Sequence, residues 1–280
     1  MTAVVFAIIG LSAFLHSLRW AQARDVYIYA MAPFNYFTAA AVFIVWSAAA
    51  GIGFGAESFL YGCAVGLCYG MSFFLLLSGM RWVGVAKTTT VVNLAYVIPV
   101  IASIVIWGEK LTILLGAGII LGLIAIPLIL LPSRSTSSQK PNIAGAMLSL
   151  GGLYVAQGAA YAIMKGFERL GRSEEKPLML AGLFTTAAVY TLCVYIVKFR
   201  RPTLKDVYHG VITGGCNAFS NASLLSAVSI MAASVVFPTF TVGTIVLVTI
   251  SSVFIWQERY SLRAWMGILL ACVSIAMMNV

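Results

Sequence analysis

The chain has 280 residues, of which 61% are hydrophobic and only 9% are charged, and it carries a net charge of +9 at pH 7. A water-soluble domain has roughly 25% charged residues, so this composition excludes a soluble globular protein. The period-2 alternation that an outer-membrane barrel requires is absent, which leaves helices as the structure that spans the bilayer.

Apolar segments follow one another along the chain, each close to the roughly 20 residues needed to cross a bilayer. The first has neither a basic region nor an A-x-A-like cleavage site, so we interpret it as a span and not as a signal peptide. A polar stretch, PSRSTSSQKPN at 132–142, divides the segments into five and five. The predicted spans are residues 3–22, 28–50, 58–80, 84–107, 112–131, 143–165, 178–197, 206–229, 231–256 and 261–280.

The third and eighth spans repeat each other. An offset of 148 residues pairs Gly62 with Gly210 and Gly66 with Gly214. The same offset pairs Cys68 with Cys216, Ser72 with Ser220 and Ser78 with Ser226. Further along the chain the offset becomes 149. There the residues Ser103, Ile106, Trp107, Glu109, Gly118 and Leu121 are repeated, in the same order, as Ser252, Ile255, Trp256, Glu258, Gly267 and Leu270. Since each copy holds an odd number of spans, the second copy enters the bilayer the other way up.

These features predict an all-α membrane protein of about ten helices, built as two inverted five-helix repeats. The repeats are expected at 1–132 and 143–280, joined by a linker at 133–142. A duplicated, almost wholly apolar chain of this kind is typical of a transporter whose site lies between the repeats.

The positions of the basic residues indicate how the chain is oriented in the membrane. The basic residues lie in short loops at span ends, without a basic surface interleaved with aromatic residues, so we expect no nucleic-acid partner. Twelve Lys and Arg fall on the face opposite the termini and five on the face of the termini. Because basic loops stay in the cytoplasm, this distribution predicts that both termini lie outside it.

A membrane enzyme needs a polar catalytic constellation or a set of metal ligands. The chain has two histidines, His16 and His209, with no acidic partner inside a span. Its five cysteines fall within spans without a C-x-x-C pair, as small packing residues do. We therefore expect no enzymatic activity, no cofactor and no metal. A structural or assembly protein is the competing class.

Two duplicated features bear on packing. The small-residue ridges of the third and eighth spans let helix backbones approach closely, either as static contacts or as seams on which the halves slide. They consist of Gly62, Gly66 and Gly70, and of Gly210, Gly214 and Ala218.

Glu109 and Glu258 precede Thr112 and Ser261 by three residues, and Thr and Ser are good N-cap residues for the helices that follow. A carboxylate there complements the positive helix end, and a gate or coupling site is the alternative.

Three segments carry a family resemblance: IWGEKLTILLGAGIILGL at 106–123, IWQERYSLRAWMGILLAC at 255–272, and ASVVFPTFTVGTIVLVTISSVFIWQE at 233–258. The chain resembles the EamA-type members of the drug/metabolite transporter superfamily. The resemblance implies ten helices, a central cavity lined by spans 1, 3, 4, 6, 8 and 9, and peripheral spans 5 and 10. Family members are often drawn with cytoplasmic termini, which the charge count contradicts. The superfamily carries many substrates on one scaffold, so fold alone does not identify one.

Polar side chains inside spans indicate a substrate path, since each costs free energy in lipid and tends to face a cavity. Pairs spaced by three or four residues share one face of a helix. The candidate substrate-binding residues are His16, Trp20, Tyr69, Ser72, Asn93, Tyr96, Gln157, Tyr161, Asn217 and Asn221. These groups either line a cavity or tie helices together.

All eight acidic residues lie at or beyond span ends, which disfavours exchange of a proton for a lipophilic cation. Aromatic faces still suit a quaternary amine. His16 either couples transport to protons or ties two helices together. Lys87 either extends its ammonium group to the lipid headgroups or anchors a substrate anion.

We expect a multi-pass protein of the bacterial inner membrane that exports a small polar or zwitterionic metabolite, such as an amino acid, by alternating access. Movement of organic cations or drugs is the alternative.

Overall fold

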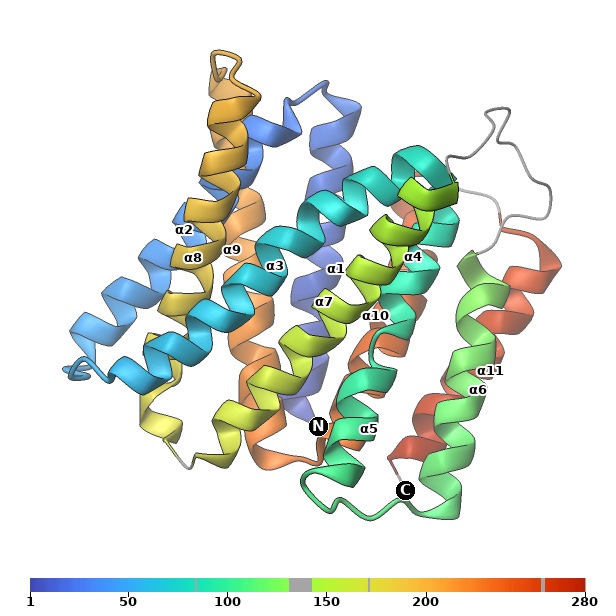
Figure 1. Cartoon of the computed structure of the whole chain (residues 1–280). Coiled ribbons are helices and arrows are strands. Elements are labelled where there is room, and N and C mark those ends of the chain that lie inside the picture. The colour runs from blue at the N-terminus through green and yellow to red at the C-terminus, as the bar shows by residue number, and fades with distance from the viewer. Residues whose placement is uncertain (84, 131–142, 171, 258–259, 280) are drawn as a thin grey trace. The chain divides into compact units, whose positions relative to one another are not determined.

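A computed structural model describes residues 1–83, 85–130, 143–170, 172–257 and 260–279. Over these ranges the chain is helical, without strands (Figure 1). Lys87 and Glu258, singled out above, fall outside the side chains that are described. The helices are α1 (Thr2–Ala23), α2 (Ile28–Ala49), α3 (Ala56–Val83), α4 (Val85–Leu94), α5 (Val97–Val105), α6 (Ile113–Leu130), α7 (Ile143–Arg169), the 3₁₀ turn η1 (Ser173–Glu175), α8 (Lys176–Val197), α9 (Leu204–Ile230), α10 (Ala233–Ile255) and α11 (Leu262–Met278).

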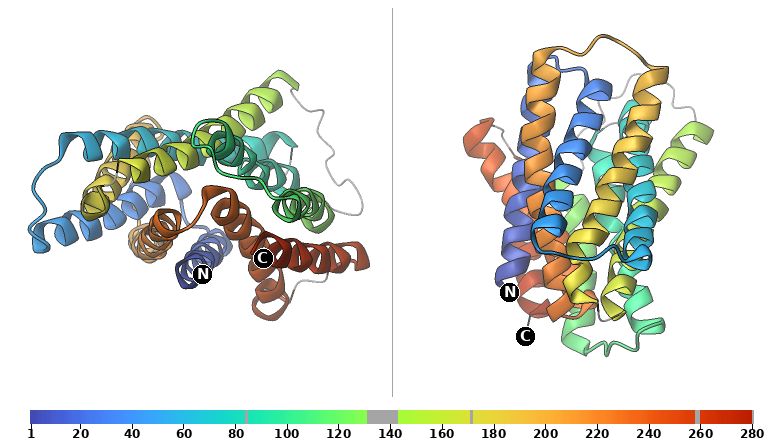
Figure 2. Two further views of the ribbon diagram at one scale, coloured as in Figure 1. Left: turned by 90° about the horizontal axis from the view of Figure 1, so that it is seen from below. Right: turned by 90° about the vertical axis from the view of Figure 1, so that its left-hand side faces the viewer.

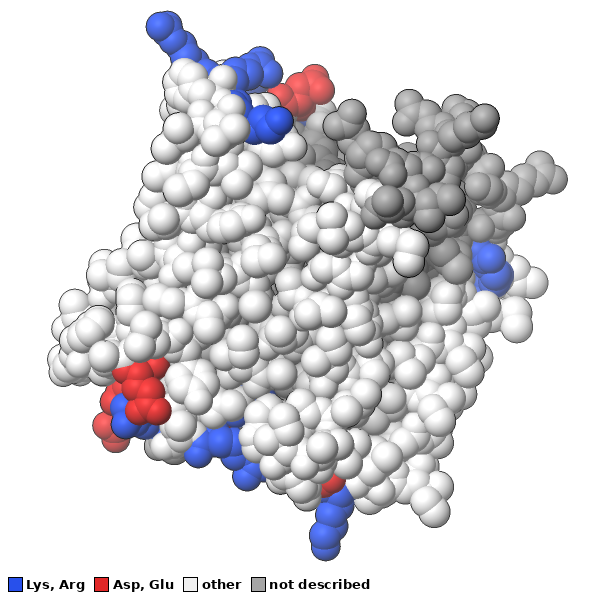
Figure 3. All heavy atoms as spheres, viewed as in Figure 1, with Lys and Arg blue, Asp and Glu red and all other residues white. Residues whose placement is uncertain are grey.

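Within the described ranges, six helical segments are long and apolar enough to cross a bilayer, and the chain is therefore compatible with a multi-pass helical membrane protein. On the face that Figure 3 shows, Lys, Arg, Asp and Glu lie near the edges of the view, and the surface between them is uncharged. The six segments are Thr2–Ala23, Ile28–Ala49, Ala56–Gly79, Met147–Arg169, Ser173–Val197 and Ala233–Ile255.

The predicted span at 84–107 is not one helix. It is divided into α4 and α5 at Ala95 and Tyr96. Pro99 explains the break, because proline has no N–H to donate to the carbonyl of Ala95 four residues earlier, and its ring clashes with that carbonyl. The Ile98 N–H reaches the Ala95 carbonyl instead, at 3.2 Å. Hydropathy alone overlooked this interruption.

The chain divides into two compact units, and each combines segments from both sides of the linker. Unit 1 contains Met1–Gly70 and Ile163–Ile230, and unit 2 contains Met71–Ala162 and Met231–Val280. In unit 1, α2 packs against α8 and α9, and α1 packs against α9 (Figure 2). In unit 2, α6 packs against α11, and α10 packs against α5, α6 and α11.

Glycines set the helix contacts of unit 1. A Cβ on Gly62 would overlap the carbonyl of Met179 on α8, and one on Gly66 would overlap the carbonyl of Leu183. On α9, a Cβ on Gly214 would overlap the carbonyl of Asn35 on α2. The helices therefore touch backbone to backbone, as small-residue ridges predict, and both static contacts and sliding seams require this close approach.

The same contacts occur twice in unit 1. Gly62 faces Met179, and Gly210 faces Met31. Gly66 on α3 also faces Thr186 on α8, just as Gly214 on α9 also faces Thr38 on α2. In each pair of contacts, the two glycines are 148 residues apart in the sequence, and so are their two partners. The offset found between α3 and α9 therefore also relates α2 to α8.

Unit 2 contains a reciprocal contact. Gly118 on α6 lies against Met278 near the end of α11, and Gly267 near the start of α11 lies against Ile129 near the end of α6. Each residue of the second contact is the copy, at an offset of 149, of a residue in the first. The Ser274 hydroxyl adds a hydrogen bond to the Gly118 carbonyl at 2.6 Å. The two equivalent helices therefore run antiparallel.

The two ends of unit 1 differ in charge. Tyr27 joins the α1–α2 and α8–α9 connections at one end, since its N–H donates to Asp206 at 2.8 Å and its hydroxyl donates to the Lys198 carbonyl at 2.6 Å. Among the described residues this end carries Arg19, Arg24, Lys198, Arg200, Arg201 and Lys205 against Asp25 and Asp206. The other end balances Lys165, Arg169, Arg172 and Lys176 against Glu57, Glu168, Glu174 and Glu175.

We expect the basic end to lie in the cytoplasm and the start of α1, at the other end, to lie outside it. Alkaline phosphatase fused to either terminus should be active, and green fluorescent protein fused there should not fluoresce. At residues 199–203, inserted alkaline phosphatase should be inactive and inserted green fluorescent protein should fluoresce. Fluorescent terminal fusions would contradict the charge rule and favour the orientation drawn for the family that the chain resembles.

Candidate functional site

A chain of side-chain hydrogen bonds links three helices of unit 1. The Tyr69 hydroxyl on α3 donates to Asn221 Oδ1 on α9 at 2.8 Å. Asn221 Nδ2 donates to Asn217 Oδ1 at 2.8 Å, and Asn217 Nδ2 donates to Asn35 Oδ1 on α2 at 3.4 Å. Three of the predicted residues, Tyr69, Asn217 and Asn221, are thus brought together.

The position of this polar chain follows from helix geometry. Asn217 and Asn221 are four residues apart, so both side chains project from the same face of α9. The exposed fractions are 1% for Asn35, 7% for Asn217 and 6% for Asn221, which places three amides in the packed interior of unit 1. Amides buried among apolar helices must satisfy one another, and these do. Tyr69, which is half-buried, is the more accessible end of the chain.

Asn35 was not predicted from the sequence. The duplication did not reveal it, because its copy at an offset of 148 is Leu183. An amide in the middle of the apolar span 28–50 was nevertheless a usable indication, by the same rule that identified Asn217.

The two predicted residues of α1 lie toward the basic end of unit 1. The Trp20 ring packs edge-on against His209 of α9, with centroids 4.9 Å apart. The Arg24 guanidinium lies 4.2 Å from the Trp20 ring centroid. His16, one turn earlier in α1, is half-buried. Trp20 therefore belongs to a group at the end of α1, and this group is distinct from the hydrogen-bonded asparagine chain.

In unit 2, Asn93 and Tyr96 do not share one helix face as predicted, because the break after Leu94 separates them. Asn93 Nδ2 donates to the Thr89 carbonyl of its own helix at 2.7 Å. Tyr96 is fully buried, and its hydroxyl donates to the Ile119 carbonyl of α6 at 3.2 Å. Tyr96 therefore ties the break to α6. The Ser72 hydroxyl has no hydrogen-bond partner among the described residues.

Tyr161 belongs to an aromatic group in unit 2. Its ring stacks on Phe237 of α10 with centroids 4.8 Å apart and meets Phe240 edge-on at 6.4 Å. The Gln157 side chain, one turn earlier in α7, hydrogen-bonds to Tyr161. The predicted pairing of Gln157 and Tyr161 on one helix face is thus observed.

Glu109 caps a helix other than the one expected. Thr112 and Ser261 cap α6 and α11 as predicted, since Leu115 N–H donates to the Thr112 hydroxyl and Ala264 N–H to that of Ser261. The Glu109 carboxylate instead accepts from the N–H groups of Ala233 and Ser234, both at 3.0 Å, and from the Ser234 hydroxyl at 2.8 Å. It therefore caps α10.

Two acidic residues in terminal helical turns are buried. Helix α7 extends to Arg169, four residues past the predicted span, so Glu168 lies inside it with its side chain 5% exposed. Lys176 Nζ lies 3.7 Å from Glu168 Oε1. Asp206, in the first turn of α9, is 2% exposed and accepts from the N–H groups of Tyr27 and Thr203. The described acidic residues thus lie at or beyond helix ends, as predicted, but not all of them face water.

Comparisons with known proteins give information on the fold of the chain and none on its activity. No family model matches the chain. A relative from Haemophilus influenzae, described as an uncharacterized protein, is 24% identical over 275 residues, which are 95% of this chain and 93% of the relative. A crystal structure of a protein aligns with a TM-score of 0.79 at 17% identity, over 100% of this chain and 99% of that one. At this identity the likeness shows a shared fold alone.

Proposed function

We propose that the chain is a secondary transporter of the EamA type, built as two inverted repeats, which exports a small polar or zwitterionic metabolite such as an amino acid by alternating access. The buried hydrogen-bonded chain of Tyr69, Asn221, Asn217 and Asn35 is the observation that carries this proposal. It supplies donors and acceptors inside apolar helices without supplying a fixed charge. Such a group recognises a substrate by its hydrogen bonds.

The repeated contacts support the inverted repeat. The glycines of α3 and α9 meet partners that are themselves related by the same offset, and α6 and its copy α11 run antiparallel. In unit 1, Tyr36 and Phe184 occupy equivalent positions at an offset of 148, and their ring centroids lie 6.4 Å apart. Equivalent residues that touch each other lie beside a two-fold axis, as expected where one copy is inverted.

The test is transport in proteoliposomes, with substrates chosen by a thermal-shift screen against amino acids, sugars, nucleosides and amines, because a ligand of the native state raises its stability. We expect Asn217→Leu to abolish saturable transport while the protein still folds, since one amide contributes about 0.6 kcal/mol to packing between membrane helices. Ser226→Leu is the matched control. Its hydroxyl bonds the Ala222 carbonyl of the same helix at an exposed position, and it should transport normally.

Normal transport by Asn217→Leu, or its failure to fold, would mean that the asparagines only tie helices together. Tyr69→Phe distinguishes the cases further, because it removes only a hydroxyl from the accessible end of the chain. A recognition role predicts a raised KM for this variant, whereas a packing role predicts an unchanged KM and lower thermal stability.

The aromatic group of unit 2 favours a second substrate class. Tyr161, Phe237 and Phe240 place three rings together, and ring faces attract quaternary amines through cation–π interactions. Under this alternative, choline or tetraethylammonium should raise the thermal stability, and Phe237→Leu should remove that effect. Under the main proposal, amines have no effect and a zwitterion does.

A further inference from the structure

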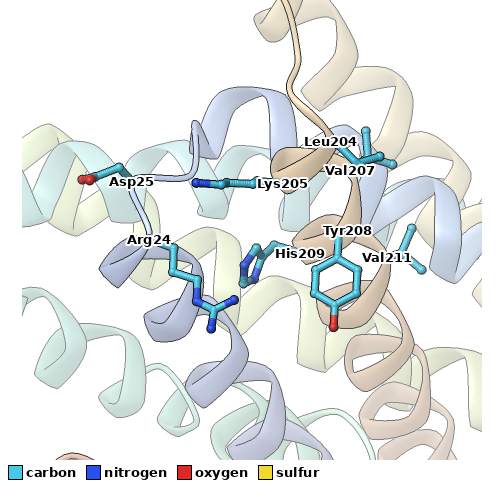
Figure 4. Close-up of a pocket in the computed structure, with 8 residues that line it drawn as sticks. All are labelled: Arg24, Asp25, Leu204, Lys205, Val207, Tyr208, His209 and Val211. Carbon is cyan, nitrogen blue, oxygen red and sulfur yellow. The ribbon is translucent and has the colours of Figure 1, made fainter.

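An open hollow of about 810 Å³ lies at the basic end of unit 1 (Figure 4). It is formed where α1 ends and α9 begins, so all of its walls belong to unit 1. Its lining residues are Arg24, Asp25, Leu204, Lys205, Val207, Tyr208, His209 and Val211. None of them belongs to the hydrogen-bonded chain proposed above for the substrate.

The polar groups of the hollow are suited to an anion. Arg24 and Lys205 supply two cations, and neither forms an ion pair with another described residue. The Arg24 guanidinium carbon lies over the Trp20 ring, 4.2 Å from its centroid. The planar guanidinium carries N–H groups along its edge, which suit bidentate binding of a phosphate or carboxylate. Asp25 also lines the hollow, but its carboxylate points away from His209 and Tyr208 (Figure 4).

A buried imidazole indicates that the hollow receives a ligand. His209 is 2% exposed, and its Nδ1 atom has no hydrogen-bond partner among the described residues. A buried polar atom without a partner costs free energy, roughly 1–3 kcal/mol in proteins. A phosphate oxygen bound in the hollow beside Arg24 and Lys205 would supply the missing partner.

The apolar side of the hollow continues as a stripe along α9. Leu204, Val207, Tyr208 and Val211 are spaced i, i+3, i+4 and i+7, which places them on one helix face. The exposed fractions of Leu204, Tyr208 and Val211 are 85%, 52% and 46%. Cations at the end of the helix and apolar side chains along its side match an amphiphile, with an anionic head and a hydrocarbon tail.

We propose that this hollow binds an anionic phospholipid, with its phosphate at Arg24, Lys205 and His209 and an acyl chain along the α9 stripe. Helix ends that carry Arg and Lys lie at the level of lipid headgroups, and basic pockets between spans at the cytoplasmic side bind such headgroups. The proposal requires only the membrane location of the chain and is independent of the transported substrate.

The experiment is native mass spectrometry of the purified chain, titrated with phosphatidylglycerol or with phosphatidylcholine of the same acyl chains. We expect one phosphatidylglycerol to be retained, with a Kd at least tenfold below that of phosphatidylcholine. Arg24→Gln with Lys205→Gln should remove this preference, and the exposed Lys205→Gln alone should weaken it several-fold. The matched control is Lys110→Gln with Arg169→Gln, which removes the same charge elsewhere and should retain the preference.

Three outcomes would overturn the proposal. An equal loss in the Lys110 and Arg169 control would indicate attraction by net charge without a site. Competition by soluble glycerol phosphate at millimolar concentration would assign the hollow to a water-soluble phosphate compound. Equal retention of both lipids by the unaltered protein would show that the hollow does not distinguish an anionic headgroup from a zwitterionic one. Thermal unfolding of each variant without lipid confirms that the fold is intact before binding is compared.

Discussion

Gly214→Leu is expected to prevent the docking of α9 on α2. A side chain at this position has no free space, because even its Cβ would overlap the Asn35 carbonyl and lie 2.8 Å from Thr38 Cβ. Overpacking a core with flexible side chains costs about 1–3 kcal/mol, and here the obstacle is backbone, which cannot move aside without displacing α2. We expect a loss beyond that range, seen as a failure to purify as a monodisperse species in mild detergent.

Gly215→Leu is the matched control for this prediction. The adjacent glycine is exposed, and no atom lies within 4 Å of a Cβ built on it. A substitution of this kind at an exposed position changes stability by about 0.5 kcal/mol or less. If both variants fold with equal stability, the contact between α9 and α2 is not a determinant of the fold.

Glu109→Ala is expected to lower the stability of unit 2 by about 2 kcal/mol, because hydrogen bonds to charged groups contribute about 1.5–3 kcal/mol and the loss of a cap costs about 0.5–2 kcal/mol. Helix α10 depends on this carboxylate, since the residue before it is Ala232, which has no side-chain acceptor. Gly108, at φ +65°, turns the loop that brings Glu109 to Ala233 and Ser234.

The measurement is thermal unfolding in detergent, with Lys110→Ala as the exposed neighbouring control. Glu109→Gln retains an oxygen acceptor but loses the charge that favours the positive helix end, so it should fall between the unaltered protein and Glu109→Ala. Equal stability of all four proteins would show that water replaces the carboxylate at the start of α10 without cost.

Sequence reasoning located the helices because each is encoded locally, by an apolar run bounded by charged or polar residues. It also predicted which glycines make close contacts, since the offset of 148 between Gly62 and Gly210 marked positions where both copies need the same small residue. Met31 with Met179 and Thr38 with Thr186 extend that offset to α2 and α8. These identities were too isolated to notice without the contacts that join them to the glycines.

Contacts between distant residues could not be predicted in this way. Glu109 lies 124 residues before Ala233, and nothing in the intervening sequence specifies that the first caps the helix of the second. The candidate site was predicted only in part for the same reason: Asn217 and Asn221 are neighbours on one helix, whereas Asn35 joins them from 182 residues away. The break beside Tyr96 was a different failure, because mean hydropathy does not register the missing N–H of Pro99.

The interleaving of distant segments in unit 1 has a consequence for biosynthesis. Helix α2 ends at Ala49, but its partner α8 begins only at Lys176, which leaves α2 without that partner for roughly 6–25 s at a translation rate of about 5–20 residues per second. During that interval the Asn35 amide has no Asn217 to bond. Until α9 is made, this amide must therefore remain unpaired or find a temporary partner.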